Sequence, residues 1–181
     1  PKIDGMRVVM HEGVPRSRSW RTHPNKMLQY LAHWFQQHYP SCAFDGEVLF
    51  QPEGYRASFR DTMSLRAESF EGDFTFFIFD DFNRKGNYAD WLESRPNLNS
   101  ALPLYCGQSA ITLQYLSTKL ITQRQEIEEL EEHYLSLGAE GLIFRSATQL
   151  YRQARSTPTA GSLLKLKRFS DAEARVISYT Q

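Results

Sequence analysis

Several charged side chains of this sequence lie on or beside apolar segments, where a charge is costly to bury and needs a reason. They are Lys2, Asp4, Arg7, Glu47, Asp80, Glu140, Lys165 and Lys167. A lysine becomes a nucleophile once it loses its proton, and a carboxylate can orient it or bind a divalent metal. Taken singly, each block is more typical of a solvated strand face or of a turn. We therefore judge these residues by their order and spacing together.

The segments that must position these residues are mostly expected strands. Lys2 and Asp4 are expected to share a face of the first strand, because side chains two residues apart lie on the same side. Apolar patterns predict strands at 6–10, 14–20, 44–50, 74–82, 111–121 (of edge type), 140–146, 163–169 and 174–180. Helices are expected at 25–39, 60–70, 88–95 and 122–138, the last with Gly138 as its C-cap. Together they predict an α+β protein of mostly antiparallel sheets flanked by helices.

Composition excludes several classes of protein. Basic and acidic residues number 21 each, so a nucleic-acid surface would have to be a local patch. Two cysteines without metal-ligand spacing argue against a disulfide scaffold and structural zinc, and favour a reducing compartment. No apolar run approaches 18 residues, so we expect that the chain does not enter a membrane. We also expect a cytoplasmic monomer. Residues 1–181 are expected to form one domain.

In their order, the charged blocks resemble the motifs of the covalent nucleotidyltransferases. The motifs are K-x-D-G-x-R at 2–7, S-R at 17–18, D-G-E at 45–47, F-D at 79–80, E-G-L-I at 140–143 and K-x-K at 165–167. This superfamily comprises ATP-dependent DNA ligases, RNA ligases and mRNA capping enzymes. The sequence is most similar to a bacteriophage-type ATP-dependent DNA ligase, from Lys2 to about Ile177. The resemblance implies an ATP-grasp-like adenylation domain and, for a phage-encoded protein, a location in the infected bacterial cell.

The resemblance implies a catalytic role for four residues and a nucleotide-binding role for several more. Lys2 would attack the α-phosphate of ATP and carry AMP, Asp4 would orient it, and Lys165 and Lys167 would hold the phosphates. Arg7 and Glu47 would contact the nucleotide, with the carboxylate at the ribose hydroxyls. The other implied roles are stacking on adenine for Phe79 and binding of Mg²⁺ for Glu140, with Glu47 as a second metal ligand.

The DNA-facing residues implied by the resemblance form two basic clusters that would bind the phosphates of nicked double-stranded DNA without reading its sequence. They are Arg16, Ser17, Arg18 and Arg21 in the first cluster, and Arg152 and Arg155 in the second. The family also carries a segment before the nucleophilic lysine and an OB-fold after the K-x-K motif. Neither is expected within this sequence, so self-adenylation by this chain is expected to be slow.

Two other readings remain open at this point. An RNA ligase or a capping-type guanylyltransferase shares the lysyl-nucleotide chemistry, and the choice between ATP and GTP would separate it. A catalytically silent nucleic-acid-binding domain could keep the same fold. The presence together of Lys2, Asp4, Glu47, Glu140, Lys165 and Lys167 argues against a silent domain, because such a domain has no reason to retain all six.

Overall fold

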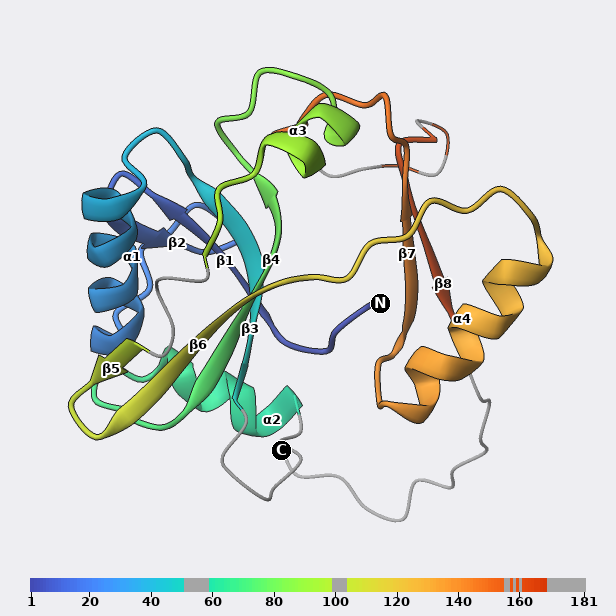
Figure 1. Ribbon diagram of the computed structural model, residues 1–181. Helices are drawn as coiled ribbons and strands as arrows, with labels where there is room; N and C mark the ends of the chain where they lie inside the picture. Colours follow the sequence, from blue (N-terminus) through green and yellow to red (C-terminus); the bar gives the residue numbers. More distant parts are fainter. Residues whose placement is uncertain (51–58, 99–103, 155–156, 158, 160, 169–181) are drawn as a thin grey trace, which may run out of the picture.

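The computed structural model of the chain contains two β-sheets, in which most neighbouring strands are antiparallel. The sheets face each other, with helices on their outer sides (Figure 1). The structure describes residues 1–50, 59–98, 104–154, 157, 159 and 161–168. The larger sheet has six strands in the order β2-β1-β3-β4-β6-β5, and the smaller sheet pairs β7 with β8. The expected α+β architecture is therefore confirmed.

The larger sheet is built from strands whose alternate side chains enter one core. It contains β1 (Met6–His11), β2 (Val14–Arg16), β3 (Phe44–Phe50), β4 (Phe74–Asp81), β5 (Leu104–Cys106) and β6 (Ser109–Tyr115). Met6, Val8 and Met10 of β1 are buried in the core, whereas Arg7 between them is exposed. This period of two places Met6, Val8 and Met10 on the core face, while the other face carries Arg7 and His11 together with the buried Val9.

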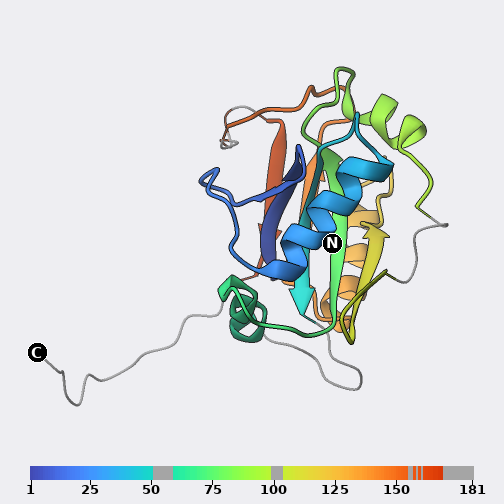
Figure 2. The ribbon, with the colours of Figure 1, turned by 90° about the vertical axis from the view of Figure 1, so that its left-hand side faces the viewer.

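Helix α1 (Lys26–His38) covers the apolar face of the larger sheet (Figure 2). Its buried residues, Leu28, Leu31 and Phe35 among them, recur at helical spacing and pack in the same cluster as Phe44 and Phe76. Asn25 caps the helix, because its side chain accepts hydrogen bonds from the backbone N–H groups of Met27 and Leu28. The opposite face of the sheet is left to face β7 and β8.

The smaller sheet pairs β7 (Gly141–Arg145) with β8 (Leu163–Lys167), and α4 (Gln125–Ser136) lies on its outer side in Figure 1. Gly138, at φ 88°, follows the α4 C-cap Leu137, as expected for a glycine that ends a helix.

The remaining helices are α2 (Phe59–Thr62), the 3₁₀ helix η1 (Met63–Arg66) and α3 (Tyr88–Ser94). None of the described helices is long and apolar enough to span a membrane.

One expectation about a strand and one about a helix are wrong. The segment around Ile111 is not an edge strand: β6 lies between β4 and β5, and its pairing with β4 is parallel. On the side away from β4, the short strand β5 pairs with it. The helix expected at 60–70 is split into α2 and η1. The strand expected at 174–180 lies outside the described residues.

Candidate active site

Lys2 lies between the two sheets because its backbone joins the start of β7. The backbone N–H of Lys2 donates to the Gly141 carbonyl at 2.8 Å, and the N–H of Glu140 donates to the Lys2 carbonyl at 2.9 Å. The expectation that Lys2 and Asp4 share a face of the first strand is wrong, since β1 begins at Met6. The physical reason is that the backbone of Lys2 pairs with the smaller sheet rather than with β3.

Two glycines permit this close approach of the sheets. A Cβ atom on Gly5 would lie 2.7 Å from Glu47 Cγ and would also clash with the backbone of Val48. Gly141 has a positive φ of 148°, and a Cβ there would collide with the carbonyl of Leu166 on β8. The glycines after Asp4 and after Glu140 are therefore required by backbone contacts on both sides of Lys2.

The Lys2 amine belongs to a cluster of charges drawn from three segments. Lys2 Nζ forms an ion pair with Glu140, whose Oε1 also accepts from Lys167 Nζ at 2.9 Å. Burial lowers the pKa of Lys2, and the positive charges of Lys167 and Lys165 lower it further, while Asp4 and Glu47 act in the opposite direction. A lowered pKa raises the fraction of neutral amine, which is the form that can act as a nucleophile.

Lys165 and Lys167 reach this cluster because they are two residues apart on β8 and so share a face of the smaller sheet. Lys167 is paired in register with Gly141, and Lys165 with Ile143. Both lysines are exposed. The sequence motif K-x-K therefore presents two cations to the side of β8 on which Glu140 lies.

Glu47 extends from β3 on the face of the larger sheet that turns away from the core. It is in register with Arg7 on β1 and with Phe77 on β4. Burial raises the pKa of Glu47 to about 7, with a further increase from the charge of Asp45, and Lys2 and Arg7 only partly oppose this. The positive charges of Lys2 and Arg7 therefore offset the burial of this carboxylate only in part.

Arg7 is held by a carboxylate that the sequence analysis did not select. Its Nε and Nη2 donate to the two carboxylate oxygens of Asp45 at 2.9 Å and 2.7 Å. The Tyr151 hydroxyl donates to Asp45 Oδ2 at 2.7 Å, and Tyr151 thus ties the segment after β7 to β1 and β3. Asp45 is 1% exposed, so this bidentate pair fixes the orientation of Arg7.

Phe79 is half-buried on β4 and lies near two guanidinium groups. The centroid of its ring is 5.9 Å from Arg7 Cζ and 5.6 Å from Arg145 Cζ. The register between β3 and β4 shifts here, because Asp45 pairs with Asp80 whereas Gly46 pairs with Ile78. Phe79 is the extra residue of this bulge, and it stays on the less buried face of β4 together with Phe77.

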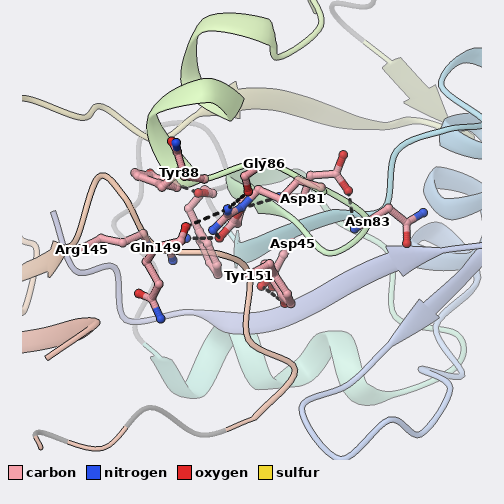
Figure 3. A network of polar contacts seen from close by, with 12 residues as sticks. Asp45, Asp81, Asn83, Gly86, Tyr88, Arg145, Gln149 and Tyr151 are labelled. Carbon is pink, nitrogen blue, oxygen red and sulfur yellow. Dashed lines mark hydrogen bonds and ion pairs between the residues drawn. The ribbon is translucent and has the colours of Figure 1, made fainter. Parts of the chain in front are cut away.

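Asp80, which received no role from the sequence, is the centre of a buried ionic network. Figure 3 shows this network with its members Gly86, Arg145 and Gln149 labelled. It is 2% exposed, accepts from Arg84 Nε at 2.6 Å, and forms an ion pair with Arg145. Arg84 Nη1 in turn donates to the carbonyls of Gly86 at 2.7 Å and Gln149 at 3.0 Å. The network fastens the segment after β7 to the end of β4, and so places Tyr151.

The predicted DNA-binding residues lie on the surface, apart from the Lys2 cluster. Arg16, Ser17, Arg18 and Arg21 belong to a hairpin loop closed by a bridge between Arg16 and Thr22. The side chains of Arg18 and Arg21 are exposed, and Arg16 Nη1 donates to Thr22 Oγ1 at 3.1 Å. Arg152 is exposed directly after Tyr151. Arg155 lies outside the described residues.

Replacing Glu47 tests the raised pKa. With a pKa of about 7 in the folded chain and 4.5 as the ordinary value, folded Glu47 binds more protons between these pH values. Its contribution to stability is therefore lost as the pH rises from about 4.5 to 7. We expect Glu47→Gln to be more stable than the parent at pH 8, by up to about 3 kcal/mol, and similar to it at pH 4.

The free energy of unfolding, measured by urea denaturation across this pH range, checks the expectation. Glu68→Gln removes the same charge from an exposed position and is the matched control. Parallel pH profiles for Glu47→Gln and the parent would show that Glu47 titrates normally.

Replacing Asp80 tests the ionic network. In Asp80→Asn the cations of Arg84 and Arg145 lose their buried partner, and we expect a loss of about 3–5 kcal/mol in the free energy of unfolding. The exposed pair of Glu68 with Lys26 provides a control, because Glu68→Gln should change stability little. Equal effects of the two substitutions on urea denaturation would contradict a structural role for the network.

Comparisons with known proteins agree with the motifs. Residues 1–167 match the family model of the ATP dependent DNA ligase domain. Two crystal structures of Chlorella virus DNA ligase-adenylate are 31% identical to the chain, with TM-scores of 0.73 and 0.74. They match 99% of this chain, which spans 65% and 64% of the two ligase chains.

A structure from a study of Lig E DNA ligases shares the fold, with a TM-score of 0.65 and 23% identity over 99% of this chain and 64% of that one. Curated proteins gave no match. The family assignment rests on the family model, which matches 167 of the 181 residues. The matched residues include every motif named in the sequence analysis. This chain belongs to the family of ATP-dependent DNA ligase domains.

Proposed function

We propose that the chain is the catalytic core of an ATP-dependent DNA ligase and that Lys2 is the residue that carries AMP. The observation that supports this most directly is the position of the Lys2 amine, held between the sheets beside Glu140 and Lys167. A nucleophilic lysine needs a lowered pKa, and burial and the two lysines of β8 provide it. Membership of the ligase family and the likeness to a ligase-adenylate support the same conclusion.

In the first proposed step, the neutral Lys2 Nζ attacks the α-phosphorus of ATP. A P–N bond forms, the bond to the β-phosphate oxygen breaks, and pyrophosphate leaves, while the amine gives up a proton. AMP is then passed to the 5′-phosphate of a nick in duplex DNA, which restores the lysine. Attack by the 3′-hydroxyl on that phosphate closes the phosphodiester bond and releases AMP.

The residues around Lys2 account for the electrostatic requirements of the first step. Lys165 and Lys167 would hold the phosphates and stabilise charge that develops on the leaving pyrophosphate. Asp4 opposes the lowering of the Lys2 pKa, as expected for a carboxylate near the amine that it would orient. Glu140 pairs with the ammonium form of Lys2, so this ion pair must open before the amine can attack.

Glu47 and Glu140 would hold Mg²⁺, which would neutralise phosphate charge during the transfer. Both carboxylates influence or contact Lys2, so they lie where the phosphates would bind. Among the described residues, no group of three or more His, Cys, Asp or Glu side chains could hold a metal ion. Phosphate oxygens and water would therefore complete the coordination, which is the usual mode of Mg²⁺.

The nucleotide and DNA would bind on the face of the larger sheet that carries Arg7, Glu47 and Phe79. Phe79 would stack on adenine and Glu47 would accept from the ribose hydroxyls. The side chains of Arg18, Arg21 and Arg152 are exposed, so they are suited to bind the phosphates of DNA. We propose that the chain acts as a monomer in the cytoplasm, at nicks in double-stranded DNA.

Covalent uptake of AMP tests the proposal. We expect the chain to gain about 329 Da on incubation with ATP and Mg²⁺, since one AMP forms a bond to lysine. The gain should be absent in Lys2→Ala and present in Lys119→Ala, a matched loss of one exposed lysine. Intact mass spectrometry, after pyrophosphate treatment to discharge any AMP already bound, measures both.

Replacing ATP by GTP separates this function from a capping-type enzyme, and adding nicked duplex DNA to the charged chain should discharge it. Uptake from GTP alone would contradict the proposal. So would uptake that persists unchanged in Lys2→Ala.

A further inference from the structure

The hairpin loop at Ser17–Arg21 contains a tryptophan in an unusual backbone conformation. The loop is closed by hydrogen bonds from the N–H of Ser17 to the Arg21 carbonyl and from the N–H of Trp20 to the Ser17 carbonyl, both 2.8 Å. Trp20 has a φ of 64°, in the left-handed region. Loops of this kind favour glycine or asparagine at such a position, because a larger side chain there is strained.

The indole of Trp20 is nevertheless held in a defined orientation. Its ring stacks on Phe82, with centroids 4.8 Å apart and planes at 27°, and lies 5.5 Å from the ring of His11. It still remains 44% exposed. The other two tryptophans of the chain differ, since Trp91 is 5% exposed and Trp34 packs against the core. Backbone strain combined with an ordered, exposed aromatic ring points to a function outside the fold.

The position of Trp20 connects it with the candidate active site. Phe82, on which it stacks, lies 5.4 Å from Tyr151, and Tyr151 shares Asp45 with Arg7. His11 and Arg7 come from the same strand and alternate with the buried residues of the core. The exposed indole of Trp20 is therefore linked to Arg7 through a series of neighbouring side chains, namely Phe82, Tyr151 and Asp45.

We propose that Trp20 is a DNA-contacting residue, whose exposed ring packs against a sugar and base of the nicked duplex between phosphates held by Arg18 and Arg21. This inference rests on the proposed ligase function. The two exposed arginines flank Trp20 in the same loop, and phosphates alternate with sugars along a DNA strand. An aromatic contact of this kind contributes affinity that does not depend on counterion release, unlike a contact between arginine and phosphate.

Binding of labelled nicked duplex DNA at several salt concentrations tests the inference. We expect Trp20→Gly to bind about tenfold more weakly at every salt concentration, in the range measured for one aromatic contact to a base. The slope of log K against log salt should stay unchanged, whereas Arg18→Gln should reduce it by about 0.9. Glycine suits the positive φ, so the variant should melt close to the parent temperature.

Tyr105→Ala is the matched control, because Tyr105 is an exposed aromatic residue on β5, at the sheet edge opposite β2. It should bind DNA like the parent. Trp20→Phe should keep most of the affinity, since a phenyl ring can replace part of the contact.

Tryptophan fluorescence of the parent provides an independent readout. DNA should quench it, and the quenching should be lost in Trp20→Phe, because Trp91 is buried in the core and Trp34 packs against it. If Trp20→Gly binds like the parent and DNA causes no quenching, the inference is wrong and the ligase function stands. If the parent itself does not bind nicked DNA at low salt, both are wrong.

Discussion

The backbone bridge between Lys2 and Gly141 is the interaction on which the site depends. It consists of two hydrogen bonds, yet it fixes the first residues of the chain against the smaller sheet and leaves the Lys2 side chain between both sheets. Glu140 lies next to the bridge, so the same contact that positions Lys2, the proposed nucleophile, also positions its carboxylate partner. The charges of Lys165 and Lys167 then act on an amine whose location is already set, and their effect on its pKa follows from that location.

A second constraint comes from buried charges at the end of β4. Asp80, Arg84 and Arg145 are costly to remove from water, and they are tolerated because each finds partners in the others or in backbone carbonyls. The result is a fixed segment after β7 that carries Tyr151 to Asp45. Arg7 therefore has a defined direction, although it lies on the exposed side of its strand. Among the residues that the structure describes, polar contacts of Tyr151 and Arg145 connect the two sheets, and this is the interface at which we propose that the substrate binds.

Sequence reasoning located the elements well where periodicity was strong, as in α1 and in the apolar strand at Phe74–Asp81. It also assembled Lys2, Glu140 and Lys167, because the motifs of one family carried that grouping. It missed Asp45 as the partner of Arg7, since pairing across 38 residues depends on the register of β1 and β3. It missed the role of Asp80, since pairing with Arg145 across 65 residues depends on how the two sheets face each other. The signal available for Asp80 was its position as a charged residue at the end of a very apolar strand. That signal did not indicate which arginines would neutralise its charge. Nor does any local pattern show that Lys2 leaves the first strand to pair with β7.

The most direct measurement is the location of AMP on the chain after reaction with ATP. Proteolysis and tandem mass spectrometry of the adenylylated protein would identify the modified residue. AMP attached to Lys2 is the expected result, because it is the lysine whose backbone is fixed between the sheets and whose pKa is lowered by burial and by Lys167 and Lys165. AMP on Lys165 or Lys167, with Lys2 unmodified, would contradict the assignment of the nucleophile and the description of the site built around it.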